Sequence, residues 1–181
     1  MESKKEIINN ILFFNCRIDS HDFKKEKDKI EVLKYFFHNF IANINKINGE
    51  IENLNNNLTS GYILVNEDNV FTSLKNFINI CYKVRIDLIE KYKENIFIQF
   101  SFELTGAYQI VIDSKYSFHI GEGVVFCRNC INLLEIFKDG FIFCGERAKE
   151  YLVDSKDSNI KTVIVNEKLQ NKNIYKVYIS S

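Results

Sequence analysis

The sequence predicts an α+β domain with a ferredoxin-like split βαβ core, in which helices cover one face of an antiparallel-rich sheet. Three observations lead to this prediction. Short apolar runs typical of strands alternate with two long stretches of helical period. The first six elements follow the order β-α-β-β-α-β of the split βαβ unit. Finally, 181 residues without an internal repeat or a linker, 46% of them apolar, predict a single domain over residues 1–181.

The first four elements are a strand, a long helix and a hairpin. Residues 7–16 are rich in Ile and Phe, and the run is short enough for a buried strand. Apolar residues then recur with a helical period over Ile30–Asn48, and Gly49 stands where a glycine commonly ends a helix. Residues 50–66 follow as two strands, so this region predicts a helix that lies on a sheet.

The second half of the chain continues with shorter elements. A helix is expected over 69–92, and an alternating strand over 96–102 leads to a turn at 103–106. The remaining expected elements are a strand pair over 108–118, a helix from 121 to 137 that is stopped at 138–140, a strand at 141–144, a helix at 146–152 and a closing hairpin of 162–165 with 174–179.

The charge and apolar patterns exclude several classes of protein. Lys plus Arg and Asp plus Glu number 24 each, so the zero net charge predicts no nucleic-acid partner and no anionic membrane surface. No apolar run approaches the roughly 20 residues that span a bilayer. The chain shows no signal-peptide pattern, and its five cysteines lie in apolar segments as reduced core thiols do. A cytoplasmic location is expected.

Four segments together carry the pattern of a known family. They are the strand end Phe13–Ser20, the helix-ending Gly49 with the hairpin segment Thr59–Gly61, the helix segment Cys127–Leu133 with the strand Gly140–Cys144, and the closing strand Tyr175–Tyr178. With these segments the chain resembles, over nearly its whole length, a class III nucleotide (adenylate/guanylate) cyclase homology domain. The resemblance implies a cyclase-type sheet with a C-terminal hairpin, and pairing of two such domains head to tail.

The resemblance also implies a two-metal site, and both expected ligands are neutral here. In the family, an aspartate that ends the first strand and one in the following hairpin hold two divalent ions, which activate the ribose 3′-hydroxyl and bind the triphosphate. The matching residues are Asn15, expected at a strand end, and Ser60, expected in a turn. Such a pair gives Mg²⁺ no fixed negative charge. We therefore interpret both as vestigial metal positions and expect no metal or other cofactor.

A second implied feature is an Asn and an Arg, four positions apart on the later helix, that hold the ribose and the transition-state phosphate. Arg128 and Asn132 stand at this spacing in the opposite order. Residues i and i+4 share a helical face, so the pair is a candidate phosphate-binding site, although an ordinary exposed face gives the same pattern. A shift of one residue would place Asn129 and Leu133 there. The base-selecting lysine of the family is matched by Asn56.

Cys127 and Cys130 form a Cys-x-x-Cys motif that invites a zinc or redox interpretation. A structural zinc site needs four ligands, and only the distant His119 and Cys144 would be left to complete it. The helical period places both cysteines of the motif in an apolar stripe. We therefore favour the interpretation that both cysteines pack in the core.

The histidines and the paired glycines give weaker signals. His21, His38 and His119 are scattered and have no evident nucleophile partner, which argues against a hydrolytic triad. Gly121-Glu-Gly123 precedes a helix but lacks the fuller glycine pattern of a phosphate-binding loop, so it predicts a plain turn.

Three functional hypotheses remain. The favoured one is a catalytically degenerate cyclase-like domain that acts as a regulatory or ligand-binding module. It would be a homodimer or pair with a cyclase-like chain, with a nucleotide as a candidate ligand of Arg128 and Asn132. Another hypothesis, which we number third, is a pure protein-interaction domain with an empty cleft. On the first and third hypotheses the chain is not an enzyme.

The second hypothesis is a working divergent cyclase that makes a cyclic nucleotide signal, from a pyrimidine triphosphate for example. It requires replacement carboxylates for Mg²⁺ or Mn²⁺. The candidates are Asp19, Asp22, Glu103 and Glu122.

Overall fold

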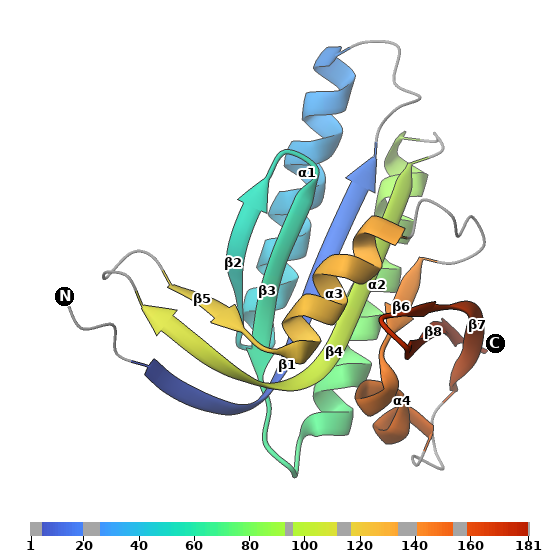
Figure 1. The fold of residues 1–181 in the computed structure, drawn as a ribbon. Coiled ribbons are helices and arrows are strands. Elements are labelled where there is room, and N and C mark those ends of the chain that lie inside the picture. Colours follow the sequence, from blue (N-terminus) through green and yellow to red (C-terminus); the bar gives the residue numbers. More distant parts are fainter. Residues whose placement is uncertain are drawn as a thin grey trace.

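The computed structural model describes residues 5–19, 26–92, 96–111, 117–133, 141–153 and 159–180. Within these ranges the chain forms eight strands and four helices (Figure 1). The elements are β1 (Lys5–Asp19), α1 (Glu26–Lys46), β2 (Gly49–Asn55), β3 (Leu58–Leu64), α2 (Val70–Tyr92), β4 (Phe97–Val111), β5 (Ser117–Ile120), α3 (Glu122–Leu133), β6 (Ile142–Cys144), α4 (Glu146–Val153), β7 (Ile160–Leu169) and β8 (Lys172–Ile179).

The eight strands described belong to one sheet. Seven of them follow the order β2-β3-β1-β4-β6-β8-β7, and β5 pairs with β4 outside this order. β6 runs parallel to β4, whereas the other neighbours are antiparallel. β1 lies in the middle of the core because β3 pairs with one of its edges and β4 with the other. The end of β1 therefore lies beside the β2–β3 hairpin, which positions the site described below.

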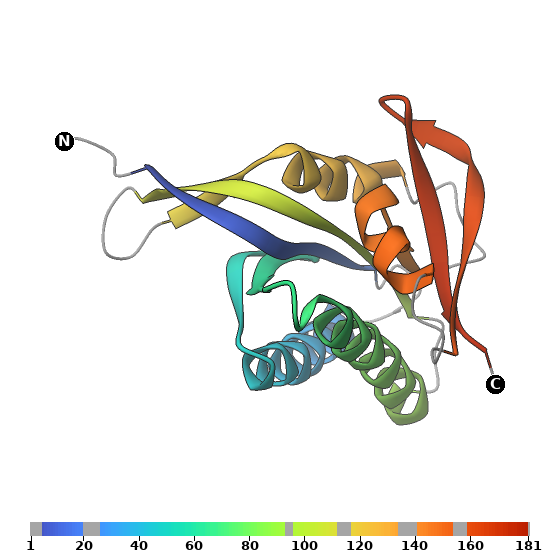
Figure 2. The same cartoon turned by 90° about the horizontal axis from the view of Figure 1, so that it is seen from below.

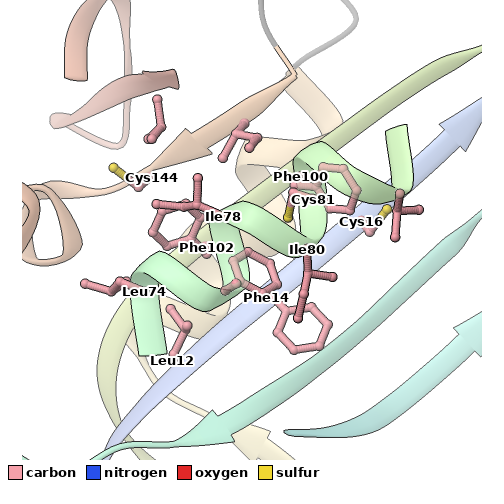
Figure 3. Packing of buried hydrophobic residues seen from close by; sticks show 14 of the residues in the cluster. Leu12, Phe14, Cys16, Leu74, Ile78, Ile80, Cys81, Phe100, Phe102 and Cys144 are labelled. Atoms are coloured by element: carbon pink, nitrogen blue, oxygen red, sulfur yellow. The ribbon is translucent and has the colours of Figure 1, made fainter. Parts of the chain in front are cut away.

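α1 and α2 pack against one face of the sheet (Figure 2). Successive side chains of β1 point to opposite faces of the sheet, as in any strand. Leu12 and Phe14 point to the face that α1 and α2 cover (Figure 3). The Phe14 ring meets Phe40 of α1 edge-on at 5.7 Å between centroids and Phe77 of α2 at 5.1 Å. Such aromatic contacts add to the burial of apolar area, and they fix both helices on the sheet.

α3 lies on the opposite face of the sheet (Figure 2), so the expectation that helices cover one face holds for α1 and α2 and is wrong for α3. Ile11 and Phe13 of β1 point to this side and pack in a second apolar cluster with Val124 and Cys127 of α3. The reason lies in β1 itself. Its run of consecutive apolar residues is typical of a strand that is buried on both faces.

Two predicted boundaries are corrected. β4 runs without a break from Phe97 to Val111, through the turn that was expected at 103–106. α1 ends at Lys46, and Asn48, not Gly49, follows the helix end in the left-handed conformation (φ 57°). Gly49 instead begins β2, where a Cβ would lie 2.6 Å from Ile44 Cγ2. The expected helix stop at 138–140 falls outside the described residues.

Candidate functional site at the end of the first strand

The residue that ends β1 is Asp19, and its neighbour in the β2–β3 turn is Asn57. The Asn57 side-chain amide donates a hydrogen bond to Asp19 Oδ1 at 2.8 Å, and the Ile18 N–H donates to the Asn57 carbonyl at 2.9 Å. Arg17 lies two positions before Asp19 on the same face of the strand, with Nε 2.8 Å from Asp19 Oδ2. Asp19 is 8% exposed, so this carboxylate is largely desolvated and already bonded on both oxygens.

Asn15 and Ser60 do not occupy the places expected of them. Asn15 lies inside β1, four positions before its end, and Ser60 lies inside β3. The two residues are direct partners across the β1–β3 ladder, so the structure does bring them together. They are 6% and 5% exposed. The prediction of a strand end and a turn at these positions is wrong, because β1 continues to Asp19 and β3 begins at Leu58.

Asn56 lies in the β2–β3 turn with a φ of 38°. Asn tolerates this left-handed region better than most residues, because its short side chain can hydrogen-bond locally. The structure thus gives Asn56 a conformational role in the turn. Its match to a base-selecting lysine stays a prediction.

Arg128 and Asn132 share the exposed face of α3, as their spacing predicts. The Arg128 side chain is 49% exposed, and its Nη2 lies 3.5 Å from Glu52 Oε2 of β2. Its guanidinium also lies 5.8 Å from the centre of the Phe13 ring. Arg128 is therefore within reach of an incoming anion, but the Glu52 carboxylate competes for its charge.

Glu52 also holds β5 to the hairpin. His119 of β5 is fully buried, and its Nδ1 lies 2.9 Å from Glu52 Oε1, which also accepts a hydrogen bond from the His119 backbone N–H. Because a carboxylate only accepts, Nδ1 carries the proton of this bond. The Tyr62 ring packs against the imidazole at 4.3 Å, and the Tyr62 hydroxyl donates to Glu50 Oε2 at 2.6 Å. These polar contacts tie together β2, β3 and β5.

The Cys127-x-x-Cys130 motif packs in the core, as the helical period indicates. Burial raises the pKa of both thiols, to about 12 for Cys130. Cys127 Sγ donates to the Phe13 carbonyl at 3.5 Å, which attaches α3 to β1. Neither thiol forms the nucleophilic thiolate at neutral pH. Among the residues that the structure describes, no group of three or more His, Cys, Asp and Glu side chains is arranged to hold a metal ion.

Glu103 and Glu122, two candidate replacement ligands, lie away from the strand end. Glu103 pairs with Phe13 of β1, six positions before Asp19, which corresponds to about 20 Å along the strand. Glu122 begins α3, and its Oε2 lies 2.7 Å from Lys172 Nζ. Asp22 and His21 fall outside the described residues. Asp19 is the one candidate replacement that the described structure places at the end of β1.

Glu103 instead caps the N-terminus of α4. Its Oε1 accepts hydrogen bonds from the backbone N–H groups of Leu104 and Ala148, each at 2.8 Å. Burial raises the pKa of this carboxyl to about 7, against the lowering effect of these backbone donors. The carboxyl therefore titrates near neutral pH inside the fold.

The overall structure resembles those of nucleotide cyclases. The adenylyl cyclase CyaB from P. aeruginosa matches with a TM-score of 0.73 and 12% identity, over 100% of this chain and 98% of that one. The catalytic core of a rhodopsin-guanylyl cyclase in complex with ATPαS matches with a TM-score of 0.72 and 12% identity, over 98% and 100% of the two chains. This chain has the fold of a class III cyclase catalytic domain. The predicted α+β fold class of cyclase-domain type is thereby confirmed.

The cyclase fold is also shared by the guanylyl cyclase domain of the RhoGC fusion protein from the aquatic fungus Blastocladiella emersonii. Its monomeric crystal structure matches with a TM-score of 0.65 and 15% identity, over 97% of this chain and 98% of that chain. No protein-family model and no curated protein sequence matches. At these identities the likeness shows the fold alone. None of the described helices is long and apolar enough to cross a membrane.

The sequence reasoning missed Arg17, Asn57 and Glu52. The run Asn55-Asn56-Asn57 is a turn signal that would have located the hairpin turn correctly, and with it Asn57. Glu52 offered no such signal, because its contacts with His119 and Arg128 join residues 67 and 76 positions away (119 minus 52 and 128 minus 52).

Proposed function

We propose that this chain is a cyclase-like domain that does not cyclise nucleotides and acts as a regulatory, ligand-binding partner module. The carrying observation is that two carboxylates are found neither at the positions matched to the metal ligands nor, within the described residues, at the end of β1 and the hairpin turn. By the resemblance, two carboxylates would hold two divalent ions at the positions of Asn15 and Ser60, which are neutral partners across the β1–β3 ladder. The end of β1 and the hairpin turn, where replacement ligands would have to lie, hold one carboxylate, Asp19, and one amide, Asn57, which bond to each other at 2.8 Å.

The charge on this pair is too small for two-metal chemistry. Two divalent ions bring four positive charges, and each Mg²⁺ site in proteins relies on one or two carboxylates besides substrate phosphates. Asp19 supplies one negative charge, and the Arg17 guanidinium at 2.8 Å already offsets it. A metal would have to compete with both Arg17 and Asn57 for the oxygens of this carboxylate.

The proposed ligand is a nucleotide or another phosphate-bearing anion at Arg128 and Asn132. Both side chains are exposed on one face of α3. Phosphate would compete with Glu52 for Arg128, and a bidentate guanidinium–phosphate contact is stronger than a single ion pair at 3.5 Å. We expect Arg128→Ala to weaken nucleotide binding about tenfold in calorimetry. Unchanged affinity would remove Arg128 from the site.

The proposed partner is a second copy or a related cyclase-like chain. Tyr108 of β4 and Ile120 of β5 are direct cross-strand neighbours, and both are large apolar side chains exposed to solvent. Burial of such a pair is the usual source of stability in a homodimer interface. One crystal structure of the fungal RhoGC cyclase domain is a dimer and another is a monomer.

Asp19 favours a second candidate, an active divergent cyclase, because it keeps a carboxylate at the strand end. The decisive experiment incubates the purified protein with each of the four ribonucleoside triphosphates and Mn²⁺, and reads the products by mass spectrometry. On the main proposal no cyclic nucleotide forms beyond a heat-killed control. A cyclic product that disappears in Asp19→Asn, with the fold intact by circular dichroism, would establish the enzyme instead.

A further inference from the structure

A cavity of about 370 Å³ lies where α3, α4 and the β7–β8 turn meet β4. Its walls come from Glu103–Thr105 of β4, the first turns of α3 and α4, and the segment Asn171–Asn173. The volume falls within the range of roughly 300–1,000 Å³ that is typical of small-molecule sites. Because Glu103 lies about 20 Å along the sheet from Asp19, the cavity is separate from the strand-end site.

Two glycines allow the walls of this cavity to close around Glu103. A Cβ on Gly145 would lie 1.8 Å from Glu103 Oε2, and a Cβ on Gly123 would lie 2.5 Å from Thr105 Cβ. The backbone of the loop before α4 and that of α3 can therefore approach β4 closely. The Glu103 carboxyl is held in one place by this close packing and by the backbone donors of Leu104 and Ala148.

Two of the five charged side chains in the lining form an ion pair with each other. Glu122 pairs with Lys172 at 2.7 Å. Glu146 accepts hydrogen bonds from the Tyr175 hydroxyl at 2.9 Å and from the Asn173 amide at 3.2 Å. The Glu122–Lys172 pair therefore contributes little unbalanced charge to the cavity, whereas Glu146 keeps its negative charge because its two donors are neutral.

Among the charged lining residues, Glu103 and Arg147, like Glu146, are not part of an ion pair in the described structure. Glu103 is bonded to backbone N–H groups, and Arg147 Nη2 donates to the side-chain oxygen of Asn10 at 3.3 Å. Within the described part of the chain, no side chain of opposite charge lies within ion-pair distance (4.0 Å) of either residue. Besides the Glu146 carboxylate, the cavity thus presents one acidic group on a β-strand and one basic group on a helix.

We infer that this cavity binds a small zwitterion, a molecule with a protonated amine that meets Glu103 and an acidic group that meets Arg147. A ligand with only negative charge would bring like charge to Glu103, and one with only positive charge would do so to Arg147. A zwitterion satisfies both, and each charge-assisted hydrogen bond is stronger than a neutral one. This inference does not depend on the proposed function.

The test uses the full chain and a panel of the twenty L-α-amino acids with β-alanine, 4-aminobutyrate and 6-aminohexanoate, whose charges lie at increasing separation. Binding is measured by isothermal titration calorimetry. At least one member is expected to bind at micromolar to millimolar concentration. Its N-acetyl and carboxamide derivatives, each lacking one charge, should bind about tenfold more weakly or worse. No binding by any member at millimolar concentration would overturn the inference.

Variants then locate the site. Glu103→Gln and Arg147→Met should each weaken the best ligand about tenfold or more, whereas Glu150→Gln, an exposed acidic control on α4, should leave the affinity unchanged. Affinity should also rise with pH toward neutrality in the wild type and lose this dependence in Glu103→Gln, because the amine pairs with the ionised carboxylate. Equal affinity in wild type and Arg147→Met would contradict the inference, even if Glu103→Gln fails to fold.

Discussion

Glu103 gives the fold a pH dependence at the scale of one residue. Its pKa is raised from 4.5 to about 7 by burial, so the folded state binds the proton more tightly than the unfolded chain. This contribution to stability is fully present below about pH 4.5 and is lost as the pH rises through 7. The total loss is on the order of 3 kcal/mol.

Glu103→Gln should therefore remove this decline. Urea unfolding at pH 5 and pH 8 measures it, and the difference in unfolding free energy between the two pH values should be smaller in the variant than in the wild type. Glu150→Gln changes an exposed carboxyl on α4, the helix that Glu103 caps, and serves as the control. An identical pH dependence in wild type and Glu103→Gln would show that this carboxyl titrates normally.

Asn57→Asp tests the charge deficit at the strand end. The variant places a second carboxylate within hydrogen-bond distance of Asp19, so without metal the like charges should lower stability by about 1 kcal/mol. Mn²⁺ should reverse this loss and raise the melting temperature of the variant, but not that of the wild type. Asn55→Asp, exposed at the end of β2, is the matched control. A wild type stabilised as strongly by Mn²⁺ would contradict the assignment.

Among the elements, the β2–β3 hairpin depends on Gly61. A Cβ there would lie 2.1 Å from the Glu50 carbonyl oxygen and 2.7 Å from Phe14 Cζ, and the backbone contact cannot yield without parting the strands. Gly61→Ala should thus cost about 2 kcal/mol or more in chemical unfolding. Gly106→Ala in β4 meets nothing within 4 Å and should cost little. Equal losses in both variants would mean that the hairpin adjusts freely.

The elements also show where sequence reasoning works and where it stops. The helix expected at 69–92 is found at Val70–Tyr92, because its apolar period is long and local. The turn expected at 103–106 does not form, because Glu103 finds donors on α4, 45 positions later, and the strand continues past it. At the site, the i, i+4 spacing of Arg128 and Asn132 correctly predicted that both lie on one helical face. The strand end was misplaced by four residues, since alternation alone does not tell where a strand stops.

For the whole molecule, the proposed interface on β4 and β5 predicts that the protein forms a dimer. The double variant Tyr108→Glu with Ile120→Lys replaces an exposed apolar pair by opposite charges, which keeps the cross-strand pair favourable. We expect sedimentation to show a dimer for the wild type and a shift of about tenfold or more in the dissociation constant for the variant. Val163→Lys, an exposed position on β7, is the control. A wild type that stays monomeric at high concentration would exclude this interface.

The central place of β1 has a consequence for synthesis on the ribosome. β1 leaves the ribosome before both of its partner strands, since Phe13 pairs with Tyr62, 49 positions later, and with Glu103, 90 positions later (62 minus 13 and 103 minus 13). At roughly 5–20 residues per second, the strand waits about 5–18 s for its last partner. During that time a run of Ile, Leu and Phe that is later buried on both faces stays uncovered, so nascent-chain holding factors should bind to the β1 segment.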